Sequence, residues 1–212
     1  ELQPWFVTAA AAELIDLDKG ERILGLTTLS EATIGWVLGT RQGVVKRVKP
    51  ELLGKDAWEI IRLDEGDEVV GAVELVDESG EFCFVTSDAN LLRFDTDRVS
   101  AQGRGGGGVA GIKLSPGAQV VFFGYVPAGD ASVVTVSGTG EGLPGTEAGL
   151  AKVTAFREYP IKGRATGGVR AHRFLKGEDT LVTAWAGPGP ARAAADSGAP
   201  IDLPEADGRR DG

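Results

Sequence analysis

Short runs of apolar residues, separated by turns rich in Gly, Asp and Pro, dominate the hydrophobic pattern of this chain. The runs are rich in Val, Leu and aromatic residues, which favours strands over helices. They cover residues 23–26, 43–48, 69–76, 82–86, 120–126, 132–136 and 181–185. Two stretches are long enough for a helix, residues 8–17 and the alanines around Ala193, but neither has an apolar stripe at helical spacing. The pattern therefore predicts an all-β fold.

Three landmarks recur in the same order and divide the chain into repeats. A turn with a threonine precedes a strand that carries a base near its end, and these threonines stand at positions 40, 86 and 146. A basic segment then runs into a further strand, around residues 55–63, 104–114 and 164–174. Acidic or polar turns contain the glycines at positions 20, 66, 117 and 177, which are 46, 51 and 60 residues apart. This period, with about four strands per copy, is typical of propeller-like blades.

The repeats predict a single domain over residues 1–212, a propeller-like array of about four blades with four strands each. We expect blade-like repeats at 35–80, 81–130 and 131–187, partial blade segments at 1–34 and 188–206, and a tail at 207–212. Residues 137–144 are predicted to form a surface loop. The chain begins without Met and without a signal-peptide pattern, so we interpret it as an excised domain.

Composition excludes several classes of protein. The 212 residues include one Cys and one His, which leaves no pair for an intrachain disulfide. A four-ligand zinc site would need carboxylates or a second chain, so we predict no metal site. No apolar run approaches the length of about 20 residues that a membrane-spanning helix needs, and we predict no membrane association. A reducing, cytoplasmic setting is favoured.

The charge of −9 is unevenly distributed. Residues 152–176 contain seven bases and one acid, whereas residues 63–81 contain eight acids and no base. The bases coincide with the first two landmarks and the acids with the third, so the repeat would place the bases on one face. That face is either a phosphate-binding surface or an ordinary solvated surface.

The three copies together resemble a known family, the C-terminal β-pinwheel domain of the A subunit of bacterial type IIA topoisomerases, namely DNA gyrase and topoisomerase IV. The resemblance covers about residues 23–185, and the Arg and Ala content suggests an actinobacterial source. It is carried by Thr40-Arg41-Gln42-Gly43-Val44-Val45-Lys46-Arg47 and by the segments 85–94 and 102–114. In this family the domain is a curved disc of four-stranded blades whose basic rim bends duplex DNA.

The resemblance implies that the chain is a non-catalytic part of an ATP-dependent enzyme. It implies non-sequence-specific binding and bending of duplex DNA in the bacterial nucleoid, next to the remainder of the A subunit, with an ATPase B subunit as a further partner. The parent enzyme would use ATP and Mg²⁺, and we expect no cofactor in this domain. Phosphate contacts are assigned to Arg41, Lys46, Arg47, Arg93, Arg104, Lys113, Lys152, Arg164, Arg170 and Arg173.

Gyrase members of the family carry the heptapeptide box Gln-Arg-Arg-Gly-Gly-Lys-Gly, which tight wrapping requires. Residues 102–108 match it in five positions, and both mismatches, Gly103 and Gly107, replace a base with Gly. This degenerate box favours a topoisomerase IV-like subunit, or a gyrase fragment whose box lies upstream. The matching residues are Gln102, Arg104, Gly105, Gly106 and Gly108.

The same glycines fit the dinucleotide-binding pattern Gly-x-Gly-x-x-Gly, which requires a strand before it and a helix after it. Neither flank fits, so the loop either brings backbone N–H groups to phosphate or connects two blades.

No catalytic constellation is predicted. His172 lacks a nucleophile partner, and neither tyrosine of the chain follows an arginine, as the DNA-cleaving tyrosine of the resembled family does. Cys83 lies between two phenylalanines and is predicted to be a buried apolar residue. A propeller-like scaffold for protein interactions is the alternative function.

Overall fold

The computed structural model describes residues 15–27, 32–51, 53–55, 57–140, 150–195, 197–206 and 208–209, and its regular structure consists almost entirely of strands. The strands are β1 (Gly35–Thr40), β2 (Val44–Val48), β3 (Val69–Leu75), β4 (Glu81–Thr86), β5 (Asn90–Asp95), β6 (Ala101–Gln102), β7 (Val109–Ala110), β8 (Val120–Val126), β9 (Ala131–Gly138), β10 (Leu150–Ala155), β11 (Val169–Arg170), β12 (Thr180–Pro188), β13 (Ala193–Ala194) and β14 (Pro200–Ile201). Two short 3₁₀ turns, η1 (Thr96–Arg98) and η2 (Phe156–Glu158), follow β5 and β10. The prediction of an all-β fold is confirmed.

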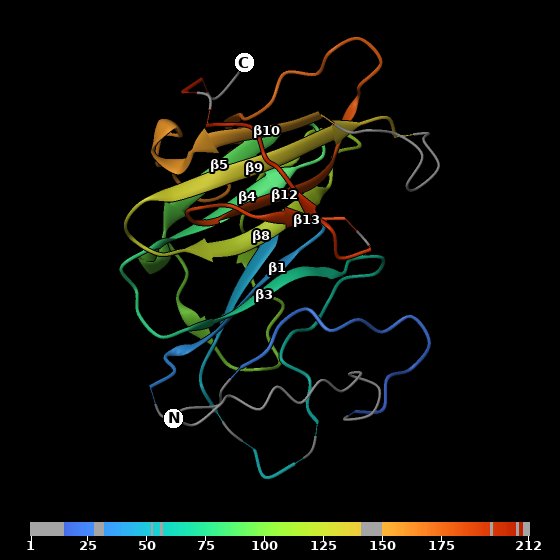
Figure 1. Cartoon of the computed structure of the whole chain (residues 1–212). Coiled ribbons are helices and arrows are strands. Elements are labelled where there is room, and N and C mark those ends of the chain that lie inside the picture. Colours follow the sequence, from blue (N-terminus) through green and yellow to red (C-terminus); the bar gives the residue numbers. More distant parts are fainter. Residues whose placement is uncertain are drawn as a thin grey trace, which may run out of the picture.

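Three sheets, which we call blades 1, 2 and 3, follow one another through the molecule (Figure 1). Each is built on a β-hairpin whose first strand also pairs with a later return strand. Blade 1 contains β1, β2 and β3, blade 2 contains β4, β5 and β8, and blade 3 contains β9, β10 and β12, all paired antiparallel. The strands β13 and β14 form a separate two-stranded ribbon.

The blades exchange strands with their neighbours. Between each hairpin and its return strand lies a long connection, which we call crossing segment 1 (49–68), 2 (96–119) or 3 (156–179). Crossing segment 2 supplies β6 and β7, and both pair with β2 of blade 1. Crossing segment 3 supplies β11, which pairs with β5 of blade 2. Blades 1 and 2 are therefore each completed by residues of the following repeat, and these crossing segments run between adjacent blades.

The repeated threonines hold the hairpin turns. The hydroxyl of Thr40 accepts a hydrogen bond from the backbone N–H of Val44 at 3.1 Å. In blade 2 the hydroxyl of Thr86 accepts one from the N–H of Asn90, also at 3.1 Å. A side chain that satisfies a turn N–H fixes where the second strand begins. The first landmark is thus a structural signal for the hairpin.

The interface between blades 1 and 2 is an aromatic core, and two glycines leave the space that it needs. Phe82, Phe84 and Phe123 of blade 2 are buried against blade 1. Gly39 and Gly71 are register partners in blade 1. A Cβ on Gly39 would lie 2.0 Å from Cγ of Phe123, and a Cβ on Gly71 would lie 2.2 Å from the carbonyl oxygen of Phe123. Only glycine permits this approach of β8, so the blade spacing depends on both residues.

A second core joins blades 2 and 3. Cys83 and Val85 of β4 pack in one buried cluster with Val133 of β9 and Leu181 of β12. Cys83 is fully buried, which confirms that it is a small apolar residue of the core. The sheet of blade 2 therefore has two apolar faces, and this explains the near-continuous hydrophobic runs in its strands.

The structure corrects two details of the expected elements, the run at 23–26 and the first strand. Residues 23–26 form no strand, and Leu26 is 92% exposed; the run lies against β3, where a Cβ on Gly25 would be 2.8 Å from the carbonyl oxygen of Ala72, but does not join its ladder. The alanines around Ala193 form the short strand β13, which agrees with their lack of a helical apolar stripe. The strand β1 is absent from the predicted runs because two glycines interrupt its apolar pattern. Residues 8–14 of the other helix candidate and residues 141–144 of the predicted loop at 137–144 lie outside the described residues, whereas residues 137–138 are the end of β9.

Candidate nucleic-acid interface

One exposed basic residue occupies the same repeat position in each crossing segment. Arg62, Lys113 and Arg173 each stand four residues before a turn glycine. Those glycines, at positions 66, 117 and 177, all have a positive φ, of 73°, 79° and 95°. The turn therefore fixes the same local backbone geometry three times, and the base preceding it projects from the surface each time.

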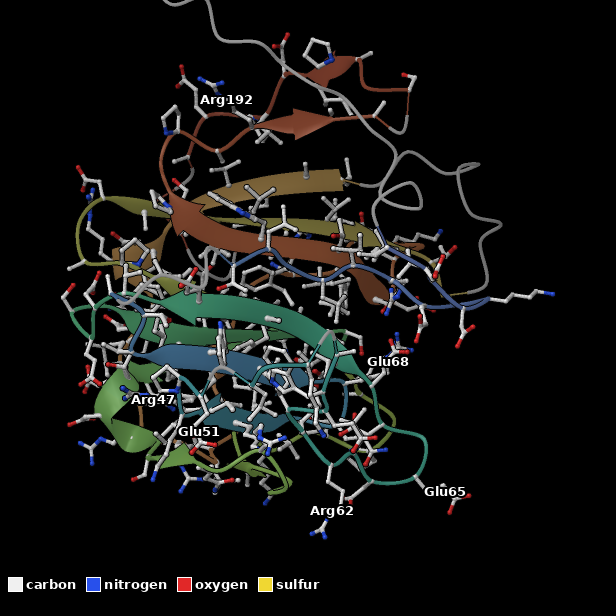
Figure 2. All side chains as sticks on the ribbon, turned by 90° about the horizontal axis from the view of Figure 1, so that it is seen from below. Arg47, Glu51, Arg62, Glu65, Glu68 and Arg192 are labelled. Atoms are coloured by element: carbon white, nitrogen blue, oxygen red, sulfur yellow. The ribbon has the colours of Figure 1, made fainter. Side chains whose placement is uncertain are left out.

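Arg62 is missing from the predicted contacts, although its spacing to Gly66 matches the spacing of Lys113 to Gly117. The first copy of the basic landmark is degenerate, which hides the correspondence. Figure 2 shows Arg62 extending outward from the edge of the fold. Within the described part of the chain, the side chains of Arg62, Lys113 and Arg173 form no hydrogen bond or ion pair, so all three guanidinium or ammonium groups are available to a ligand.

Hydrogen bonds join the three crossing segments into one path. The N–H of Arg62 in crossing segment 1 donates to the carbonyl of Gly106 in crossing segment 2 at 3.3 Å. Further along, the N–H of Lys113 donates to the carbonyl of Thr166 in crossing segment 3 at 3.0 Å. The basic residues of successive blades thus lie on crossing segments that hydrogen bonds join from blade to blade. A long polyanion can follow such an arrangement.

Crossing segment 3 is the most basic of the three. Its residues 159–176 include five Lys or Arg residues and no acid. Arg170 and Arg173 are both exposed, whereas His172 between them is 5% exposed. The strand β11 ends at Arg170, so the three residues that follow do not continue its alternation. Both arginines therefore face solvent, and the histidine packs inward.

Lys46 is not on the surface, which corrects its assignment as a phosphate contact. The residue is fully buried, and its ammonium donates hydrogen bonds to the carbonyls of Ile60, Arg104 and Gly106 at 2.8, 2.5 and 2.6 Å. Burial, together with the nearby charge of Arg62, lowers the pKa of Lys46. Its three donors are used within the protein, and none faces a phosphate.

Arg47 and Arg93 occupy equivalent places on β2 and β5, and both are largely buried. Arg47 pairs with Glu78, and only 12% of its side chain is exposed. Arg93 has the same exposed fraction, lies 3.3 Å from Glu81 and stacks over the ring of Phe156 at 4.5 Å. Because these cations are largely buried and already have acidic partners within the blades, they are poorly placed for DNA.

Four other predicted contacts are partly engaged. Arg41 pairs with Glu68, and 42% of its side chain is exposed. Arg104 lies 3.9 Å from Glu51, and 36% of its side chain is exposed. The remaining two donate to backbone carbonyls: Lys152 to Ala171 at 3.3 Å, and Arg164 to Ala110. A surface ion pair of this kind is worth little, so phosphate can compete for Arg41 and Arg104.

The degenerate box forms a glycine loop beside β2. Gly108 has a φ of 89°, and a Cβ there would lie 2.7 Å from the carbonyl oxygen of Val45, so this position requires glycine. Gly105 and Gly103 are exposed, with no heavy atom within 4 Å of an added Cβ. Gly106 is held through its carbonyl by Lys46. The loop therefore has both a structural base against β2 and an open outer side.

No catalytic or cofactor constellation is present among the described residues. Burial raises the pKa of the Cys83 thiol. His172 Nδ1 lies 2.8 Å from the hydroxyl of Thr135, and both side chains are buried in the core. No cluster of His, Cys, Asp or Glu in the described ranges could hold a metal ion. Among the same residues, no helix is long and apolar enough to span a membrane.

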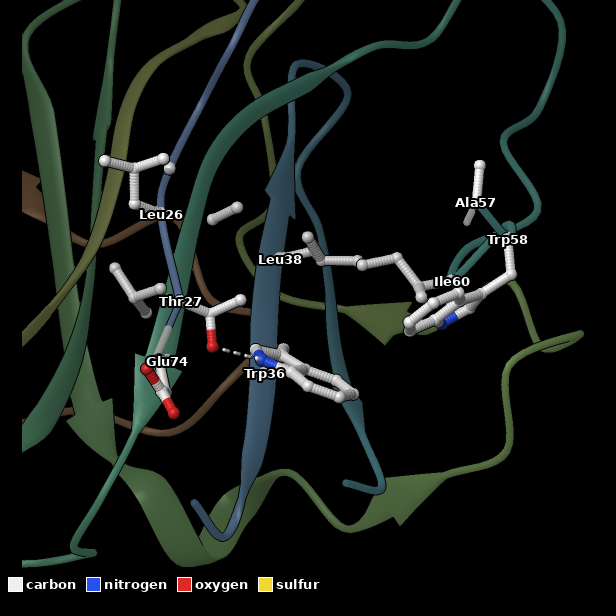
Figure 3. A pocket seen from close by; sticks show the side chains of 11 residues that line it. Leu26, Thr27, Trp36, Leu38, Ala57, Trp58, Ile60 and Glu74 are labelled. Atoms are coloured by element: carbon white, nitrogen blue, oxygen red, sulfur yellow. Dashed lines mark hydrogen bonds between the residues drawn. The ribbon is translucent and has the colours of Figure 1, made fainter. Parts of the chain in front are cut away.

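An apolar pocket lies on the outer face of blade 1 (Figure 3). It has a volume of about 430 Å³, and Trp36, Leu38, Trp58 and Ile60 form much of its wall. The indole N–H of Trp36 donates to the hydroxyl of Thr27 at 3.1 Å. The residues that line it include no Lys or Arg and one acid, Glu74.

Comparison with known proteins decides the family. A family model described as "DNA gyrase C-terminal domain, beta-propeller" matches residues 59–74, 80–127 and 145–184. The chain belongs to the DNA gyrase A C-terminal domain family. It is 34% identical over 179 residues to the A subunit of DNA gyrase from Escherichia coli, covering 81% of this chain and 19% of that protein. The chain thus spans about a fifth of the length of such relatives.

Two solved structures share the fold of this gyrase-type domain. The C-terminal domain of DNA topoisomerase IV superposes with a TM-score of 0.76 at 21% identity, covering 96% of this chain and 64% of that one. The DNA gyrase A C-terminal domain superposes with a TM-score of 0.64 at 21% identity, covering 84% of this chain and 58% of that one. The predicted β-pinwheel fold and the predicted family are therefore confirmed.

Proposed function

We propose that this domain binds duplex DNA without sequence specificity and bends it along the three crossing segments. The observation that carries the proposal is the repeated exposed base at Arg62, Lys113 and Arg173, on backbone that hydrogen bonds join from blade to blade. Repeats that present one cation per blade match a repeating phosphate backbone and offer no set of groups to read base edges. Contacts spread along a curved path offset the cost of bending the duplex.

The domain would serve a larger enzyme. We propose that it belongs to the A subunit of a type IIA topoisomerase, whose remainder, with an ATPase B subunit, ATP and Mg²⁺, changes DNA topology in the bacterial nucleoid. The absence of bases at Gly103 and Gly107 supports wrapping weaker than that of a complete box. This favours a topoisomerase IV-like use of the domain, although the E. coli relative carries the name of gyrase.

The test is duplex binding across a salt series, combined with end-to-end fluorescence transfer to measure bending. We expect affinity to fall steeply with salt, and each phosphate contact contributes about 0.9 to the log-log slope. Replacing Arg62, Lys113 and Arg173 together with Gln should reduce this slope by about 2.7, because three contacts are lost.

A matched control removes the same charge elsewhere. Lys19, Arg192 and Arg209 lie outside the crossing segments, and Arg192 stands beside the C-terminal ribbon (Figure 2). Changing these three to Gln should leave the slope and the bending unchanged. Equal losses in both triple variants would show that net charge alone governs binding. No duplex binding by the wild type would contradict the proposal and favour a scaffold for protein interactions.

A further inference from the structure

Lys46 is a buried cation whose ammonium group is surrounded by backbone carbonyl groups. An ammonium group has three donors and no acceptor, and here three carbonyl oxygens lie within 2.8 Å of it. A buried charge is costly unless all of its donors are satisfied, so these contacts are strong constraints on the backbone they hold.

The three carbonyls come from two different crossing segments. Ile60 belongs to crossing segment 1, whereas Arg104 and Gly106 belong to the glycine loop in crossing segment 2. Gly106 also accepts the N–H of Arg62. A single ammonium on β2 therefore fixes the glycine loop relative to the preceding crossing segment, and with it the backbone that carries the side chains of Arg62 and Arg104.

The fold itself does not require a lysine at this position. Counted from the hairpin threonines, Lys46 corresponds to Leu92 in blade 2 and to Lys152 in blade 3. Leu92 is 1% exposed in a complete blade, so an apolar side chain suffices for packing. The crossing segment over Leu92 is attached by backbone bonds, including the N–H of Lys162 to the carbonyl of Arg93 at 3.0 Å.

We propose that Lys46 is a positioning residue for DNA binding, which clamps the glycine loop so that Arg104 and Arg62 present their cations at a fixed spacing to one duplex. The assignment rests on the proposed function. It replaces a direct phosphate contact by an indirect one: Lys46 supplies no charge to DNA, but it determines whether two neighbouring cations act together. Loss of the clamp should leave the blade folded and uncouple Arg104 from DNA.

The test is a double-mutant cycle on the salt dependence of duplex binding. Lys46→Leu copies the residue of blade 2, and Lys46→Met is a second neutral variant in case the branched side chain does not fit. In the wild-type background, Arg104→Gln should reduce the log-log slope by about 0.9. In either Lys46 background it should change the slope by close to zero. Arg173→Gln, on blade 3, should reduce the log-log slope by about 0.9 in every background.

Amide hydrogen exchange provides a readout on the loop itself. In the Lys46 variants the amide of Arg62, bonded to Gly106, should exchange faster. The amide of Lys113, bonded to Thr166 in the equivalent place on blade 2, should be unchanged, and its acceleration would indicate general destabilisation and overturn the assignment. If Arg104→Gln still reduced the log-log slope by the full wild-type amount in the Lys46 backgrounds, this too would overturn the assignment, while leaving the proposed function intact. Absence of duplex binding by the wild type would overturn both.

Discussion

Restoring a base at Gly103 should strengthen DNA binding. This is one of two positions where the family box has a base and this chain has glycine. No heavy atom lies within 4 Å of a Cβ added there, and the residue is exposed on a loop whose neighbours are held by Lys46. Gly103→Arg therefore adds a cation to the open side of the loop without disturbing its attachment to β2.

The size of the gain follows from counterion release. One new phosphate contact steepens the log-log slope by about 0.9, which corresponds to roughly eightfold tighter binding at 0.1 M salt relative to a 1 M reference. Gly107→Arg should gain less, because an added Cβ would lie 3.3 Å from the carbonyl oxygen of Arg62 and the loop must shift to admit it.

Fluorescence anisotropy of a labelled duplex between about 50 and 200 mM salt is the suitable assay for this effect, since that range resolves one contact. Gly103→Gln is the matched control, because it makes the same backbone change without a charge. If Gly103→Arg and Gly103→Gln gave the same slope, the glycine loop would not face DNA, and the reasoning that places the interface on the crossing segments would fail at this loop.

Three further predictions concern stability and reactivity. Gly71→Ala should destabilise the domain by about 1–3 kcal/mol in urea unfolding, because its Cβ would meet the carbonyl of Phe123 at 2.2 Å, whereas Gly54→Ala, with open space around it, should be nearly neutral. Cys83 should not react with a thiol reagent until the domain unfolds, since burial raises the pKa of its thiol; rapid labelling of the native protein would contradict this. Burial, then the charge of Lys152, lowers the pKa of His172 in the folded state, so stability present above about pH 6.5 should decline as the pH falls through the lowered pKa. His172→Ile, the residue at this place in blade 2, should remove that part of the pH dependence in urea unfolding, and an unchanged pH profile would refute the prediction.

The sequence determined the fold class and the repeat, because both are local or periodic properties. Apolar runs bounded by turn residues predicted strands β2, β3, β4, β8, β9 and β12, and the repeated threonines marked the hairpin turns. The turn glycines, with their positive φ, fixed the repeat position of Lys113 and Arg173, and the same spacing would have identified Arg62. Such signals depend only on neighbouring residues, so they can be read without the tertiary structure.

Only the tertiary structure separated the available bases from the engaged ones. The sequence does not distinguish Lys46, Arg47 and Arg93 from exposed basic residues. In the structure, carbonyls of the glycine loop between β6 and β7 hold the ammonium of Lys46, while the other two side chains have acidic partners. The residues whose carbonyls bind Lys46 lie 14, 58 and 60 positions away, because blade 1 is completed by the following repeat. Whether a cation meets solvent or a carbonyl depends on such long-range contacts, and no local pattern of charge encodes them.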